Sequence, residues 1–153
     1  MTPSGDFMDE ALRVTAPLAA RYGLTPVRVG DDVLLLIGRD FGIQLLADFD
    51  TTHVAYVDAG PGGGLRVVGL DAYLQDQRFT PEDRAQFGRP VGRTEHVIAA
   101  LRVVASGLAN RCDDILRGER AWLTRLRSRD SARWRGGSPD PAVAAALCQR
   151  WAR

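Results

Sequence analysis

The sequence predicts an α+β fold: an N-terminal helix, then an antiparallel meander sheet of four or five strands, then a helical C-terminal half packed on one face of the sheet. Two patterns predict this fold. Between residues 27 and 70, short strand-like segments follow one another with only tight turns between them. On either side of this region, apolar residues recur at helical spacing. Because the turns leave no room for crossover helices, neighbouring strands must be antiparallel.

The strands are expected at residues 33–37, 41–49, 53–59 and 65–70, with a fifth over 27–29. In 41–49, apolar residues alternate with residues that include Gly42, Gln44 and Asp48, which is the pattern of a strand with one buried face. The run 33–37 is apolar at every position. We therefore expect it inside the sheet, covered on both sides.

The first helix is expected to begin at Asp6, whose side chain is a good N-terminal cap, and to end at Gly23. Its apolar stripe would cover the sheet. Pro17 lies inside this stripe and lacks the N–H that a helix interior needs. It predicts a kink or a break near Thr15.

Further helices are expected to begin near Asp71, Thr80, Thr94, Glu119 and Asp140. The Thr80 start is a strong one, because a hydroxyl cap is followed by proline and two acids. The helix from Thr94 carries an apolar line that continues to Ile115, and Gly118 is expected to stop it.

Residues 1–135 are expected to form a single α+β domain, since 153 residues suit one domain with its own core. Residues 136–153 would then be a short linker and a C-terminal helix. That helix carries Val143, Leu147 and Trp151 on one side. This side must pack on the same domain, on a partner, or on a second copy in a homodimer.

The composition is that of a globular protein, with 45% hydrophobic and 25% charged residues. No apolar run reaches membrane-spanning length, and the first residues lack the basic and apolar regions of a secretory signal. We therefore expect a cytoplasmic protein that does not bind membranes. Cys112 and Cys148 have no metal-ligand spacing and are expected to be reduced.

Charge is distributed unevenly along the chain. Residues 1–60 carry nine acids and four arginines, whereas residues 111–153 carry ten arginines and five acids. The acidic part suggests a partner-binding face composed of Asp31, Asp32, Asp48, Asp50 and Asp58. The basic part suggests an alternative nucleic-acid face composed of Arg120, Arg125, Arg127, Arg129 and Arg133. In that second stretch the interleaved apolar residues favour one face packed on the core, with arginines directed into water.

No residue is assigned to catalysis, to a cofactor or to a metal. Lysine is absent, which excludes Schiff-base and Walker-loop chemistry, and the glycine-rich stretch 60–64 leads into a strand. Asp48, Asp50, His53 and Asp58 lie around one predicted turn, where ordinary turn chemistry is favoured over a cation site. An enzyme with a site in the sheet-helix cleft would have to gather His53 or His96 with carboxylates.

Four segments carry a resemblance to a known group of proteins. They are Arg21-Tyr22-Gly23-Leu24, Phe41-Gly42-Ile43-Gln44-Leu45, Val68-Gly69-Leu70 leading into Ala72-Tyr73-Leu74, and Leu108-Ala109-Asn110 leading to Asp113 through Glu119. In their order, residues 7–126 resemble small bacterial immunity proteins of toxin and contact-dependent competition systems. The resemblance implies a non-catalytic protein that neutralises a partner toxin by binding it. Its acidic face would meet a basic, nuclease-like toxin. An arginine-mediated nucleic-acid or nucleotide binder is the first alternative, and an enzyme with a site in the sheet-helix cleft is the second.

Overall fold

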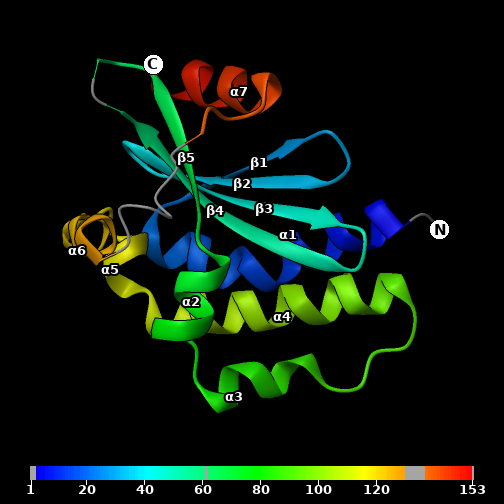
Figure 1. Ribbon diagram of the computed structural model, residues 1–153. Coiled ribbons are helices and arrows are strands. Elements are labelled where there is room, and N and C mark those ends of the chain that lie inside the picture. Colours follow the sequence, from blue (N-terminus) through cyan, green and yellow to red (C-terminus); the bar gives the residue numbers. More distant parts are fainter. Residues whose placement is uncertain (1–2, 61, 130–136, 153) are drawn as a thin grey trace.

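A five-stranded antiparallel sheet with helices on both faces forms the centre of the computed structural model, which describes residues 3–60, 62–129 and 137–152 (Figure 1). The strands are β1 (Thr25–Val29), β2 (Val33–Ile37), β3 (Phe41–Asp48), β4 (Thr51–Ala59) and β5 (Leu65–Gly69). Their order in the sheet is the order of the chain, so each strand pairs with its sequence neighbour. The predicted α+β fold is confirmed, and its sheet has five strands.

The helices lie before and after the sheet in the sequence. They are α1 (Pro3–Tyr22), α2 (Asp71–Gln77), α3 (Pro81–Arg84), the 3-10 turn η1 (Ala85–Phe87), α4 (Arg93–Arg111), α5 (Asp113–Leu116), α6 (Ala121–Arg129) and α7 (Pro141–Trp151). None of these helices, which cover only the described part of the chain, has the length and apolar character needed to span a lipid bilayer.

One face of the sheet packs on α1 and α4 (Figure 1). The core on this side contains Phe7 of α1, Leu101 of α4 and Ile43 of β3, all fully buried. The Tyr56 ring meets the Trp122 indole edge-on, with ring centroids 5.0 Å apart. This aromatic contact attaches α6 to the sheet.

The opposite face of the sheet is covered by α7 (Figure 1). Val143 and Leu147 pack there against Leu35 and Val57 in a second apolar cluster. The Trp151 indole N–H also donates to the Gly38 carbonyl at 3.0 Å. Strand β2 therefore lies between two apolar layers, and all five of its residues are buried, as the sequence predicts. The helical half packs on one face through α4, whereas α7 covers the other.

Both edge strands of the sheet have a feature that restricts further pairing. Strand β1 carries Pro26, which has no N–H to donate to a ladder. On β5, Val67 donates to the Gly137 carbonyl at 2.8 Å, and Gly137 donates back to Val67 at 3.1 Å. Gly137 thus pairs with the β5 edge at one position.

Helix α1 differs from its prediction at two points. It begins at Pro3, so that Asp6 lies in its first turn and is not its cap. The predicted break near Thr15 is wrong, because one helix runs through Pro17. Buried side chains on both sides of the proline, Phe7 and Leu18 among them, hold the two halves on the sheet. Tertiary packing here outweighs the missing backbone hydrogen bond.

The long helix after Thr94 is shorter than predicted. It ends at Arg111, and Cys112 has non-helical angles of φ −128° and ψ 33° before α5 begins. The Arg78 guanidinium donates to the Arg111 carbonyl at 3.0 Å and to Asp114 at 2.7 Å. An arginine from α2's C-terminal end therefore binds the carbonyl that the break sets free. Gly118, with φ +82°, ends α5 instead.

A substitution at Gly107 would test how closely α4 packs against Phe79. A methyl group at this position would lie 2.0 Å from the Phe79 ring. Gly107→Ala should therefore destabilise the protein by about 1–3 kcal/mol, although alanine normally favours a helix over glycine by about 1 kcal/mol. Urea unfolding would measure the loss. In a Phe79→Ala background the same change should be neutral or stabilising, and an equal loss in both backgrounds would contradict the proposed clash.

Candidate docking surface

Two turns bring four of the predicted acids together at one end of the sheet (Figure 1). The β1–β2 turn carries Asp31 and Asp32, and the β3–β4 turn is flanked by Asp48 and Asp50, all four exposed. The register places Val33 opposite Leu46, and the Ala47 N–H donates to the Asp32 carbonyl at 2.8 Å. We call these four residues the acidic turns.

Asp58, the fifth predicted acid, does not belong to this surface. Its side chain is fully buried near the opposite end of β4, where it pairs with Arg66 at 2.9 Å and with Arg120 at 2.8 Å. It lies on the inner side of the strand with Tyr56 and Val54. Every second residue of a strand points to the same face of the sheet, so Val54 and Tyr56 already predict that Asp58 points to the buried face.

The Tyr56 hydroxyl is a buried polar atom near this ion cluster. Among the described residues it has no hydrogen-bond partner. Burial raises the pKa of Tyr56 to about 12, so the hydroxyl remains neutral. The aromatic packing of its ring on Trp122 accounts for its position.

The structure describes the side chains of only two of the five arginines in the predicted nucleic-acid face, Arg120 and Arg125. The Arg120 guanidinium binds Asp58 and also lies 3.3 Å from Asp40. Arg120 therefore holds α6 to the sheet. Arg125 is exposed on α6. The side chains of Arg127 and Arg129, and the whole of Arg133, lie outside the described residues.

Phe49 lies between two of the acids and was not expected on the surface. The alternating pattern predicted it on the buried face of its strand, but β3 ends at Asp48 and Phe49 projects from the turn with 63% of its surface exposed. The Arg93 guanidinium lies 3.7 Å from the centre of its ring. This cation–π contact connects the β3–β4 turn to the start of α4.

His53 bridges two carboxylates beside the same turn. Its Nε2 lies 3.0 Å from Asp48, and its Nδ1 lies 3.1 Å from Asp71. Asp71 also accepts a hydrogen bond from the Val54 N–H at 3.0 Å. Partial burial opposes a charge on the imidazole, but the two carboxylates outweigh it and raise the pKa of His53. The pKa of Asp48 is lowered chiefly by the hydrogen bond from the Phe49 N–H, and secondly by the hydrogen bond with His53.

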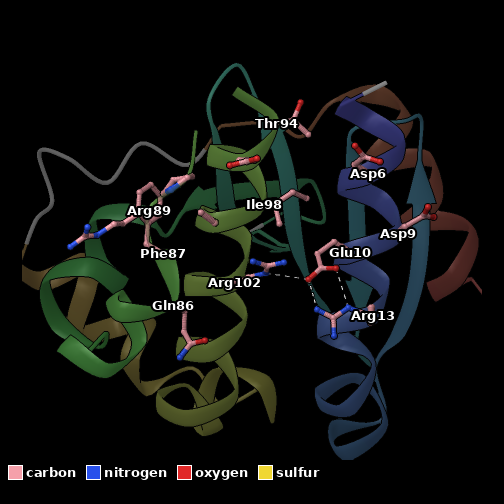
Figure 2. Close-up of a pocket in the computed structure, with 14 residues that line it drawn as sticks. Asp6, Asp9, Glu10, Arg13, Gln86, Phe87, Arg89, Thr94, Ile98 and Arg102 are labelled. Atoms are coloured by element: carbon pink, nitrogen blue, oxygen red, sulfur yellow. Dashed lines mark hydrogen bonds and ion pairs between the residues drawn. The ribbon is translucent and has the colours of Figure 1, made fainter. Parts of the chain in front are cut away.

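A polar pocket of about 700 Å³ lies beside this surface, between α1 and α4 (Figure 2). Glu10 on α1 binds both Arg13 and Arg102, and these contacts lower its pKa, with the Arg13 hydrogen bond the largest cause. The contact between Glu10 and Arg102 therefore connects the two helices across this pocket. In the described part of the chain, no group of three or more His, Cys, Asp or Glu side chains is placed to hold a metal ion.

Asp58 and Asp50 offer a comparison between a buried and an exposed acid. Asp58→Asn should destabilise the protein by about 2–4 kcal/mol, because Arg66 and Arg120 lose a buried counter-charge. Asp50→Asn should change stability by less than about 0.5 kcal/mol. Urea unfolding of both variants would measure this difference. Equal stabilities would contradict a structural role for Asp58.

The His53 cluster predicts a pH dependence of stability. Since the folded state raises the pKa of His53, the stabilisation is complete below about pH 6.5 and is lost as the pH rises through the folded-state value. His53→Gln should therefore lower the melting temperature at pH 6, by about 1 °C, and leave it unchanged at pH 9. His96→Gln is the control, because that ring faces the Gly92 carbonyl. A loss that is the same at both pH values would rule out the charged contact.

No family model matches the chain, and neither the curated proteins nor the solved structures contain a match. The roles assigned to the acidic turns, Phe49 and His53 therefore depend on their geometry and charge alone. The resemblance to immunity proteins stays a prediction.

Proposed function

We propose that this protein is a non-catalytic binding protein of the immunity type, which neutralises a basic partner toxin by direct contact. The observation that carries the proposal is that the acidic turns share one end of the sheet with an exposed aromatic side chain, Phe49. Protein interfaces are enriched in aromatic residues at their centre and polar at their rim. The acidic turns and Phe49 have this composition.

Electrostatic complementarity favours a basic partner. Asp31, Asp32 and Asp50 are exposed at the end of two adjacent hairpins. Like charges gathered in this way attract an oppositely charged protein and orient it before contact. The Arg93 contact restricts the Phe49 ring in advance. A ring held in place loses less conformational entropy when a partner covers it.

Among the reactive side chains of the described structure, the Cys112 thiol is unsuited to act as a nucleophile. The Cys112 thiol is buried, and desolvation raises its pKa to about 12, so it stays protonated at neutral pH. His53 lies between two carboxylates, which is the arrangement that the enzyme alternative requires, so this side chain does not separate binding from catalysis. The interactions of Arg120 with Asp58 and Asp40 give this arginine a structural role, which removes one residue from the predicted nucleic-acid face.

Charge reversal at the acidic turns tests the proposal. Asp48→Arg/Asp50→Arg should weaken binding to a toxin encoded beside this chain by about tenfold or more, measured by isothermal titration calorimetry. The matched control is Asp76→Arg/Glu119→Arg, which changes net charge equally at two exposed sites on other elements.

An equal loss in the control pair would assign the effect to net charge, and unchanged affinity in the first pair would remove the proposed surface. Titration with double-stranded DNA tests the alternative directly. Tight binding that falls steeply with salt would favour the nucleic-acid function over the immunity-type one.

A further inference from the structure

An apolar groove of about 320 Å³ opens beside the acidic turns, between the start of β4, α2 and α4. It exists because β5 is shorter than β4. Strand β5 pairs with β4 only from Ala55 to Ala59, and the chain then turns into α2 after Leu70 donates to the Val54 carbonyl at 2.9 Å. Among the described residues, no strand pairs with the first residues of β4 on the side where β5 pairs with the rest of β4. Helices α2 and α4 form the walls of the groove there.

The floor of the groove is apolar. Val54 of β4, Phe79, and Val103 and Val104 of α4 line it. Phe87 stands at its edge with 38% of its surface exposed, one of the large hydrophobic side chains that the described structure leaves in water. A groove of this kind gains free energy when an apolar side chain displaces water from it.

The rim of the groove is polar and carries acidic groups. Asp71 and His53 line it, and Asp48 binds the outer nitrogen of His53. Asp50 precedes the first strand residue of the lining, Thr51. The groove therefore borders the β3–β4 turn with its two acids, Asp48 and Asp50. A groove with an apolar floor and a carboxylate rim is complementary to an apolar side chain that is flanked by cations.

We propose that this groove receives one large apolar side chain from a basic segment of the partner protein, whose flanking arginine or lysine side chains bind Asp48, Asp50 and Asp71. The inference rests on the proposed function and adds to it the chemistry of the partner's contact segment. The apolar side chain supplies the specificity, because the acidic turns alone would attract any basic surface.

Short peptides test this inference on the intact protein. The 15N-labelled chain would be titrated with Ac-Arg-Arg-Phe-Arg-Arg-NH2 and with the matched Ac-Arg-Arg-Gly-Arg-Arg-NH2, followed by NMR. The phenylalanine peptide should bind about tenfold more tightly, as expected when an aromatic side chain is only partly removed from water. It should shift the amide signals of Val54, Val103 and Val104, whereas the glycine peptide should shift only those of the acidic turns.

A blocking variant tests the position of the contact. Gln75 is exposed and lines the groove, so Gln75→Trp should obstruct it without disturbing the core. The tenfold preference for phenylalanine should then fall below about twofold. Ala72→Trp, at an exposed position of α2 outside the groove, should keep the preference.

The outcomes separate this inference from the proposed function. Equal affinity for the two peptides would overturn the groove and leave the acidic turns as a binding surface. No response to either peptide would overturn the proposed role of the groove, and it would also count against a basic partner. Shifts at Val54, Val103 and Val104 that depend on the concentration of the protein alone would replace the partner with a second copy of this chain.

Discussion

The burial of β2 on both faces is the constraint on which the rest of the structure depends. Its five apolar residues, Val33 to Ile37, have no polar side chain to direct toward water. The fold must therefore supply two covering layers. Helices α1 and α4 form one, and α7 forms the other after the chain has passed through the rest of the fold. At the end of the sheet that carries the acidic turns, the turns replace these layers.

Local patterns predict most of the fold because the forces behind them act over a few residues. The Thr80 cap is one such case, since its hydroxyl and the Asp83 carboxylate bind each other's backbone N–H groups. The break at Cys112 was missed because it is stabilised from outside the helix, by the Arg78 guanidinium. The unbroken α1 was missed for the same reason, as packing on the sheet holds Pro17 within it.

The candidate site was predictable in composition but only partly in geometry. The hairpin arrangement of the sequence indicates that Asp31 and Asp48 approach each other, because turns of alternate hairpins meet at one end of a meander. The exposure of Phe49 depends on where β3 stops, and a shift of one residue would reverse it. The pairing of His53 with Asp71 joins residues that are eighteen positions apart, and no local pattern specifies it.

The two edges of the sheet limit how this molecule associates with others. Pro26 leaves the edge strand β1 without one backbone N–H donor. On the other edge strand, β5, Gly137 forms hydrogen bonds with the backbone of Val67. Each feature hinders the pairing of an incoming strand at one position of the edge. The side chains of the turns can change without altering the ladder beneath them. Substitutions in the turns of such a scaffold change its surface while its interior remains the same.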